Sequence, residues 1–345
     1  MRVGVIGCGR VAQRRHLPAL SKMEGVQVVA LADTDPDRLS KVAARFHVDK
    51  AYDCYPRLLE DESIDAVLVC TPPALHHEHA AAVLASGRHV YVEPPLALSV
   101  EDCDSLIQLG SGAKSIAAVG LNLRYHPLIQ RARRAIEEGL VGPVQAISAT
   151  YTTPSRGRRG DEFPAWRQPQ TADGSVLMEG AVHHFDAWRY LSGAEFADIT
   201  ARAAFPGGPV SLTATMRREA GDPIMVAAVF SEYAGDNSEI RIMGREGTIS
   251  LSLYRFNGFD YCPALVHPGS IRQYLRHLTE SVRSLPRGLG QLRGGDYART
   301  FELQLEAFLR AAEGRAAPPV SLADGRAATV AALAALKSMD ASPAA

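Results

Sequence analysis

The chain has 345 residues, of which 46% are hydrophobic and 22% are charged. This length is enough for two hydrophobic cores, because single domains usually hold about 100–200 residues. The 37 lysines and arginines nearly balance the 38 aspartates and glutamates, so no strong net charge would attract nucleic acid or an anionic membrane. The composition favours a two-domain protein that acts on a small molecule.

The first residues and the cysteines indicate the cellular compartment in which the protein is expected to act. The first residues enter a strand pattern directly, without the charged and apolar regions of a signal peptide, and no long apolar run predicts a membrane span. The five cysteines are an odd number and lack the paired CxxC spacing of zinc or redox sites. We interpret them as reduced packing residues, and we predict a cytoplasmic protein without a metal site.

Short apolar runs alternate with helical patterns over residues 1–121. The runs are rich in β-branched residues, as strands buried on both faces should be, and the helical segments begin near Asp or Ser caps. The predicted strands are Val3–Ile6, Val26–Ala32, Ala66–Cys70, His89–Val92 and Ile116–Val119, and the predicted helices are Pro36–Phe46, Tyr55–Asp61, His77–Ser86 and Val100–Gly110. Repeated units of this kind predict an α/β fold with a doubly wound parallel sheet, a Rossmann domain.

The pattern changes after Asn122. A helix predicted over Pro127–Glu138 is followed by long alternating segments joined by Gly and Asp turns, which predict an open, mainly antiparallel sheet with one exposed or partner-covered face. These strands are Val144–Thr152, Ala197–Ala204, Ser211–Met216, Ile224–Tyr233, Ser238–Met243 and Thr248–Leu253. A loop is predicted over Leu285–Gly295, helices over Tyr297–Glu313 and Leu322–Met339, and a frayed end over DASPAA. We therefore expect a nucleotide-binding domain over 1–121 and a substrate-binding and oligomerisation α/β domain over 122–340.

The segment GVIGCGRVA places a GxGxxA motif directly after the first strand. Gly7 permits a tight turn, Gly9 lets a pyrophosphate approach the backbone, and Ala12 allows a helix to pack closely on the strand. Asp33 ends the second strand, where its carboxylate can accept hydrogen bonds from both ribose hydroxyls and would repel a 2′-phosphate. The combination predicts a dinucleotide site that favours NAD over NADP, rather than a glycine-rich turn in an unrelated α/β protein.

Longer motifs resemble the Gfo/Idh/MocA family, named for glucose–fructose oxidoreductase and inositol dehydrogenase. The resembling stretches span nearly the full length: GVIGCG, TPPALH, GRHVYVEPPLA, GLNLRYHP, WR, GSVLMEGAVHHFD, MGREGTISL and QLEAFLRAAEGRAAPPVSLADGRAA. The resemblance implies a Rossmann domain followed by an α/β domain whose open sheet often forms an oligomer face, giving a dimer or tetramer. It also implies NAD-dependent redox chemistry on a sugar, inositol or related polyol.

Family position assigns a set of coenzyme residues. They are Gly7, Gly9, Arg10, Val11, Ala12, Asp33, Thr71, Pro72, His76, Glu93 and Pro94. The two other histidines of this region, His77 and His79, are expected to face solvent on the helix that follows.

One position departs from the family pattern. The usual Glu-Lys-Pro string, whose lysine is a catalytic or substrate-binding group beside the nicotinamide, is here Glu93-Pro94-Pro95. Proline has neither an amine nor a backbone donor, so Pro94 cannot replace the lysine in hydrogen bonding or proton transfer. In the family the bond before the last proline is often cis, and a Pro–Pro pair is compatible with such a turn.

A second family signature places an acid, a histidine and another acid on one helix. Here the three are Glu179, His183 and Asp186, which can line one stripe because they are four and three residues apart. The pattern suits a histidine general base whose tautomer is set by carboxylates. We predict His183 as the acid/base at the substrate alcohol; a metal site is disfavoured, since no HExxH pattern or third compact ligand group accompanies the spacing.

The substrate pocket is expected to draw on residues near the domain junction. Arg124 and Tyr125 follow the fifth strand, at the edge where doubly wound sheets hold ligands. The residues predicted to contact substrate are Arg124, Tyr125, Trp166, Arg167 and His184. The arginine-rich loop PSRGRRGDEF is interpreted as a solvated surface loop rather than a phosphate site.

Three functions fit these observations. The first is an NAD(P)-dependent oxidoreductase that moves a hydride between nicotinamide and a secondary alcohol or ketone of a sugar, inositol or polyol. The second is a lyase, hydrolase or epimerase that retains NAD, which the missing lysine would allow. The third is a catalytically silent dinucleotide-binding protein, which the presence of His183 with both acids disfavours.

Overall fold

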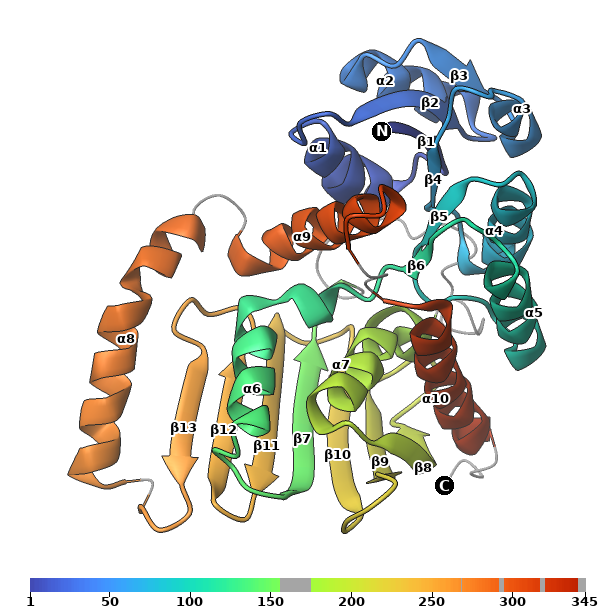
Figure 1. Ribbon diagram of the computed structural model, residues 1–345. Helices are drawn as coiled ribbons and strands as arrows, with labels where there is room; N and C mark the ends of the chain where they lie inside the picture. The colour runs from blue at the N-terminus through green and yellow to red at the C-terminus, as the bar shows by residue number, and fades with distance from the viewer. Residues whose placement is uncertain (156–174, 268, 292–294, 317–319, 341–345) are drawn as a thin grey trace. The chain divides into compact units, whose positions relative to one another are not determined.

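The computed structural model describes residues 1–155, 175–267, 269–291, 295–316 and 320–340 (Figure 1). The chain divides into two compact units. The first comprises Met1–Asn122 and Phe301–Val330, and the second comprises Leu123–Thr300 and Ala331–Ala345. Residues 301–330, which the sequence assigned to the second domain, therefore pack with the first unit.

The first unit is built on a six-stranded parallel sheet in the order β3-β2-β1-β4-β5-β6. Its strands are β1 (Arg2–Ile6), β2 (Gln27–Ala32), β3 (Lys50–Tyr52), β4 (Ala66–Val69), β5 (His89–Val92) and β6 (Ala117–Val119). Strand β4 is buried along its whole length, as expected for a parallel strand covered on both faces. The doubly wound parallel sheet predicted from the sequence is confirmed, with the short β3 as an additional strand.

Helices connect these strands. They are η1 (Ala12–His16), a π-helical turn that leads into α1 (Leu17–Leu20), then α2 (Pro36–Phe46), α3 (Tyr55–Leu59), the 3-10 turn η2 (Pro73–Leu75), α4 (His76–Ala85) and α5 (Val100–Ser111). Asp35 caps α2 and Ser99 caps α5, each accepting a hydrogen bond from a backbone N–H of the first turn. The later helix α9 (Gly295–Ala312) adds Leu305, Phe308 and Leu309 to the core that contains Val3 and Val5 of β1.

The second unit holds a seven-stranded sheet in the order β13-β12-β11-β7-β10-β9-β8. Its strands are β7 (Val144–Thr152), β8 (Glu195–Ala203), β9 (Val210–Arg217), β10 (Ile224–Ser231), β11 (Asn237–Gly244), β12 (Gly247–Ser252) and β13 (Phe259–Pro263). Strands β7 and β10 are parallel and every other pair is antiparallel. The predicted open, mainly antiparallel sheet is confirmed, and β13 is an element that the sequence analysis missed.

One face of this sheet is covered and the other is exposed. Helices α6 (Pro127–Glu137) and α7 (Val182–Ser192) lie over one face, while burial alternates along β9 and β10 (Figure 1). Met225 and Val229 on the opposite face are 57% and 43% exposed. This alternation is the pattern expected of an antiparallel sheet with a single covered face.

The C-terminal third contains a correction to the predicted loop. Helix α8 runs over Ile271–Gln291, so residues 285–291 are helical although they contain Pro286 and two glycines. Proline and glycine weaken a helix locally, but the helical turns that precede them supply most of the hydrogen bonds, and the element continues past them. Helix α10 (Leu322–Asp340) matches the predicted span to within a residue.

None of the described helices is both long enough and apolar enough to cross a membrane. All five cysteines are free, and Cys8, Cys70 and Cys103 are buried. Burial raises the pKa of the Cys8 thiol to about 12 and that of Cys103 to about 11, so both remain protonated at neutral pH.

Candidate active site

The turn after β1 has the geometry expected of a phosphate-binding loop. Gly7 adopts a left-handed φ of +91°, and a Cβ there would lie 2.7 Å from the carbonyl oxygen of Cys70. A Cβ on Gly9 would meet no protein atom within 4 Å. Gly7 is thus required by the neighbouring strand, whereas the bare backbone of Gly9 borders open space that fits a pyrophosphate.

The other coenzyme residues predicted near this turn have varied environments. Arg10 is exposed, Val11 is half-buried, and Ala12 is wholly buried where the helix packs on the sheet. Thr71 and Pro72 are half-buried at the end of β4, next to Gly7. Their positions at the carboxyl ends of β1 and β4 agree with the edge at which doubly wound sheets bind ligands.

Asp33, at the end of β2, is only 9% exposed and is surrounded by donors. The backbone N–H groups of Cys8 and Asp35 donate to its two oxygens at 2.7 and 2.9 Å. Arg38 donates from Nε and Nη2 at 3.0 and 2.6 Å. Burial raises the pKa of Asp33, but the Arg38 guanidinium and the two backbone donors outweigh burial and hold the pKa below its ordinary value.

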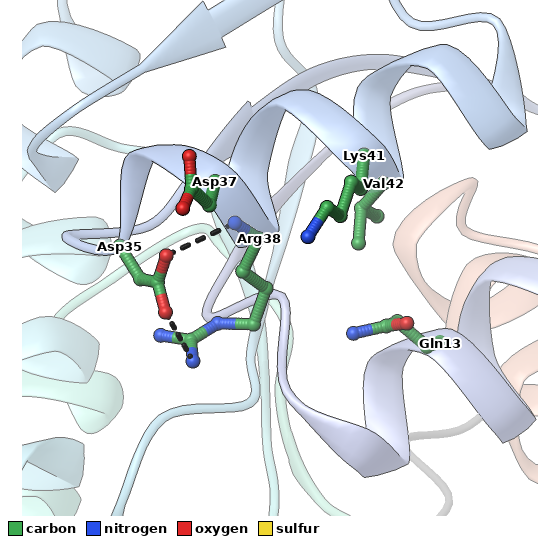
Figure 2. Close-up of a pocket in the computed structure, with 6 residues that line it drawn as sticks. All are labelled: Gln13, Asp35, Asp37, Arg38, Lys41 and Val42. Atoms are coloured by element: carbon green, nitrogen blue, oxygen red, sulfur yellow. Dashed lines mark hydrogen bonds and ion pairs between the residues drawn. The ribbon is translucent and has the colours of Figure 1, made fainter.

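A cavity of about 370 Å³ opens beside Arg38, the guanidinium partner of this carboxylate (Figure 2). It is lined by Gln13, Asp35, Asp37, Arg38, Lys41 and Val42. Gln13 also donates to the carbonyl oxygen of Cys8 at 2.7 Å, which ties the cavity to the glycine turn. Gln13, Arg38 and Lys41 were not predicted from the sequence. Arg38 and Lys41 lie in the DPDRLSK stretch, residues 35–41, on the first turns of α2.

The Glu93-Pro94-Pro95 turn follows β5. The peptide bond between Pro94 and Pro95 is cis. The Glu93 carboxylate lies 2.9 Å from Nε2 of His16, whose side chain is fully buried, whereas that of Glu93 is 15% exposed. Gly120 makes room for this arrangement, since a Cβ there would lie 2.8 Å from the Glu93 carboxylate oxygen. Glu93 is thus held in place from behind by a buried imidazole.

His76 links two loops at this edge of the sheet. Its Nδ1 lies 2.7 Å from the carbonyl oxygen of Pro95 and its Nε2 lies 2.8 Å from that of Thr71. Burial lowers the pKa of His76, and a neutral imidazole has one N–H, so it donates to only one of the two oxygens. Being 1% exposed, His76 positions the loops around the predicted coenzyme site rather than offering a free side chain to it.

The expectation that His77 and His79 both face solvent is wrong for His79. His79 is 7% exposed, with Nδ1 3.0 Å from the hydroxyl of Thr71 and its ring 4.5 Å from that of Tyr55. On a helix packed against a sheet, residues three apart share a face, so His79 follows His76 inward. His77 is half-exposed and lies 3.1 Å from the hydroxyl of Ser105.

The predicted catalytic helix of the second unit starts with the π-helical turn η5 (Leu177–Ala181), which continues into α7. Gly180 lets this turn lie against β7, because a Cβ there would come within 2.7 Å of the Tyr151 ring. The His184 ring also lies 5.2 Å from that of Tyr151. The helix start is therefore fixed at the end of β7, and Tyr151 is a neighbour that the sequence analysis missed.

The structure separates the three residues of the predicted catalytic stripe by burial. Glu179 and His183 are half-buried, whereas Asp186 is fully buried. Arg124 donates from Nε and Nη2 to the two Asp186 oxygens at 2.8 and 2.6 Å. Arg124 keeps 15% of its side chain exposed and lies 5.2 Å from the ring of Tyr190. Asp186 thus orients Arg124, a residue that the sequence analysis had placed in a separate group.

His184 is 2% exposed and packs against the rings of Tyr151, Trp188 and Phe230. Burial, with a smaller effect of the neighbouring His183, lowers its pKa to about 3. The prediction that His184 contacts substrate is therefore not supported, because His184 is a neutral core residue. His183 and His184 are consecutive on the helix and so point in different directions, and the His184 ring points toward Tyr151 and Phe230 of the sheet.

Of the other residues predicted to contact substrate, Tyr125 lies in a described part of the chain and two do not. Tyr125 is half-buried beside Arg124, and burial raises its phenol pKa well above the ordinary value, so it stays protonated. Trp166 and Arg167, with the arginines of the PSRGRRGDEF loop, lie outside the described residues. Within the described ranges no group of three His, Cys, Asp or Glu side chains is arranged to hold a metal ion.

Comparison with known proteins agrees with this architecture. Residues 1–121 match the Gfo/Idh/MocA model described as an oxidoreductase family with an NAD-binding Rossmann fold, and residues 129–250 match a Gfo/Idh/MocA C-terminal domain. The myo-inositol 2-dehydrogenase of Thermotoga maritima is 28% identical over 256 residues, covering 73% of this chain and 72% of that protein. The inositol 2-dehydrogenase of Rhizobium meliloti is 25% identical over 302 residues, covering 82% and 87%.

Solved structures share the fold across the whole chain. The WlbA dehydrogenase of Bordetella pertussis, solved with NADH and UDP-GlcNAcA, superposes with a TM-score of 0.77 at 21% identity and covers 99% of this chain and 97% of its own. With the glycine turn, Asp33 and both domain matches in place, the chain belongs to the Gfo/Idh/MocA family of NAD-dependent oxidoreductases.

Proposed function

We propose that this chain oxidises or reduces a secondary alcohol or ketone of an inositol, sugar or related polyol. The observation that carries the proposal is the similarity to two inositol 2-dehydrogenases over 73% and 82% of this chain. Bound NAD supplies the hydride acceptor or donor. In the first unit, Gly7 and Gly9 would hold the pyrophosphate, Asp33 the adenosine ribose, and the Glu93-Pro94-Pro95 turn would border the nicotinamide end.

His183 is the proposed proton acceptor for the substrate hydroxyl. A neutral His183 takes the hydroxyl proton as the hydride leaves the same carbon, and it returns that proton in the reverse direction. His184 supports this role because burial keeps it neutral at neutral pH, so no adjacent positive charge opposes protonation of His183. Arg124, oriented by Asp186 and partly exposed, would donate hydrogen bonds to substrate hydroxyls.

Pro94 favours a second candidate function. A proline supplies no proton-transfer group where relatives of this family carry lysine, and loss of one such group typically lowers a rate by about 10²–10⁴. In a lyase, hydrolase or epimerase that retains NAD, the hydride taken from the substrate would return to it within the same turnover, so no net redox change occurs and the proton transfers can differ from those of a dehydrogenase. The two candidates differ in whether NADH accumulates.

The test is absorbance at 340 nm with NAD and a panel that includes myo-inositol, scyllo-inositol and simple sugars. Stoichiometric NADH formation supports the dehydrogenase; substrate conversion without NADH, followed by chromatography of the products, supports the second candidate. His183→Gln should lower kcat by about 10²–10⁴ at unchanged NADH affinity. His267→Gln, an exposed histidine of the same unit, is the matched control. An unchanged kcat in His183→Gln would refute the assigned role.

We also infer that the chain forms a homo-oligomer through the exposed face of the seven-stranded sheet, in the cytoplasm. Support for the oligomer comes from the apolar Met225 and Val229 on that face. Support for a reducing compartment comes from five unpaired cysteines. Val229→Asp should lower the mass measured by light scattering, whereas Ser111→Asp, exposed at the end of α5 in the first unit, should leave it unchanged. A wild-type monomer would overturn the assembly proposal.

A further inference from the structure

Helix α8 is attached to the rest of its unit through its polar side. It lies beside the edge strand β13 (Figure 1). Gln273 is 2% exposed and donates to Oδ1 of Asp260 at 3.1 Å. Further along the helix, His277 lies 2.7 Å from the Asp260 carboxylate and Glu280 pairs with Arg131 of α6. The side of α8 that faces the sheet is therefore polar, which reverses the usual arrangement of an amphipathic helix.

The opposite side of α8 carries a row of large apolar side chains that are exposed to solvent. They are between 46% and 76% exposed: Ile271, Tyr274, Leu275, Leu278, Val282 and Leu285. Apart from Tyr274 they recur alternately four and three residues apart, the spacing of the apolar positions in a coiled coil, and we call these five the α8 seam. Monomers rarely leave a contiguous apolar patch of this size in water, so the seam indicates an interaction surface.

The width of the exposed apolar row favours a second helix as its partner. A helix that lies on lipid buries a wide apolar face, whereas an apolar row confined to four-and-three spacing is the narrower seam of a helix pair. Among the positions that flank the seam over residues 272–281, Arg272, Thr279 and Ser281 are polar and Tyr274 is apolar. The helix also contains four arginines and one glutamate, which makes an anionic membrane the competing occupant.

We propose that the α8 seam binds the same seam of a second copy of this chain, with the two helices antiparallel about a two-fold axis near Leu278. Leu278 is the middle member of the seam. An antiparallel pair therefore sets Ile271 of one protomer against Leu285 of its partner, and Leu275 against Val282. Each protomer buries the same residues, so the contact is closed and the whole seam is covered.

Electrostatics favour the antiparallel direction. Arg272 lies in the first turn of α8, at the end where the helix dipole is positive. A parallel pair would bring both positive helix ends and both Arg272 side chains to one end of the contact. An antiparallel pair instead places each amino-terminal end, with its Arg272, alongside the carboxyl-terminal half of the partner helix, where the dipole is negative.

This contact differs from the exposed sheet face inferred above to join protomers, and it does not depend on the proposed reaction. A standard interface buries about 800 Å² on each partner, from about 20–30 residues. The six exposed side chains of α8 supply a smaller contact, so we expect a dissociation constant in the micromolar range. Together the two contacts would give a tetramer, and the α8 contact by itself would give a dimer.

Sedimentation velocity over a range of protein concentrations tests the α8 contact. Leu278→Glu should raise its dissociation constant at least about 100-fold, because the charge enters the middle of the seam twice. Arg283→Glu places the same side chain at an exposed position of α8 outside the seam, and it should change the constant less than about threefold. Val229→Asp alters only the sheet face, so it should leave the α8 dimer intact.

Two results would overturn the proposal. One is a Leu278→Glu protein that self-associates as the wild type does. The other is a wild type that stays monomeric up to about 200 μM, well above a micromolar dissociation constant. If that monomer sediments with phosphatidylserine vesicles and Leu278→Glu does not, the seam binds lipid instead of a second copy.

Cysteine crosslinking tests the direction of the helices, with the wild type as the control for its own cysteines. Leu278→Cys should form a disulfide between protomers under mild oxidation. Ile271→Cys should not, since the two residues 271 would lie about 21 Å apart along an antiparallel pair and a disulfide needs Cα atoms within about 7 Å. Adding Leu285→Cys to Ile271→Cys should restore the crosslink. A crosslink in Ile271→Cys alone would contradict the antiparallel arrangement, and none in Leu278→Cys would contradict the two-fold axis.

Discussion

Replacing Asp186 with asparagine tests whether the buried pair with Arg124 holds the second unit together. Asp186 has no exposed surface, and both of its oxygens accept from Arg124. Asparagine keeps the shape but turns one acceptor into an NH₂ donor that faces a guanidinium. Breaking a buried ion pair by removing one partner costs about 3–5 kcal/mol. Because Arg124 keeps 15% exposure and its contact with Tyr190, we expect the lower end, about 3 kcal/mol.

Urea unfolding followed by tryptophan fluorescence measures this loss, since Trp188 is fully buried on the same helix. The double variant Arg124→Met, Asp186→Leu should recover most of the stability, because apolar replacement of both partners is often neutral. It should not recover activity, since the oriented guanidinium is gone. A loss below about 1 kcal/mol in Asp186→Asn, or a double variant as unstable as the sum of the single changes, would refute the reasoning.

Substitutions at Gly7, Gly120 and His184 test three other features of the fold and of the candidate site. Gly7→Ala should abolish NADH binding and lower stability, because its Cβ would lie 2.7 Å from the Cys70 carbonyl oxygen; Gly25→Ala, with a φ of +72° but no atom within 4 Å, should cost only about 1–2 kcal/mol in urea unfolding. Gly120→Ala should displace Glu93 from His16 and weaken NADH binding at least tenfold in fluorescence titration, whereas Gly112→Ala, whose nearest contact is 4.0 Å away, should leave it unchanged. The pKa of His184 falls from 6.5 to about 3 on folding, so the unfolded chain binds the extra proton and stability drops as pH falls from 6.5 toward 3. His184→Phe should remove up to about 1.4 kcal/mol per pH unit of that slope in urea unfolding, and parallel curves for the two proteins would contradict the assignment.

The sequence predicted most accurately the elements whose formation depends on residues close to one another in the chain. The β-branched runs predicted the strands of the parallel sheet nearly to the residue, and Asp and Ser caps predicted its helices, because burial on both faces and capping leave distinct patterns. It failed at 285–291, where proline and glycine indicated a loop and the chain is helical. It also missed β3 and β13, because most of their residues are exposed or half-buried and neither strand has a continuous apolar run.

The candidate site shows the same division. The glycine motif and Asp33 were readable because their spacing is imposed by a turn of fixed geometry. The partner of Asp186 was not, since Arg124 lies 62 residues earlier and meets it only through folding. His184 and His79 were misplaced because sequence spacing does not reveal which face of a helix packs inward.

The sequence by itself therefore determined the order of elements, the dinucleotide turn and the family, since these depend on contacts between residues close in the chain. Tertiary structure alone decided which side chains are available: Arg38 covers Asp33, Arg124 engages Asp186, and His184 is buried among aromatic rings. Burial and partner choice depend on residues brought together from distant segments, and these set the charge and reach of every group at the site.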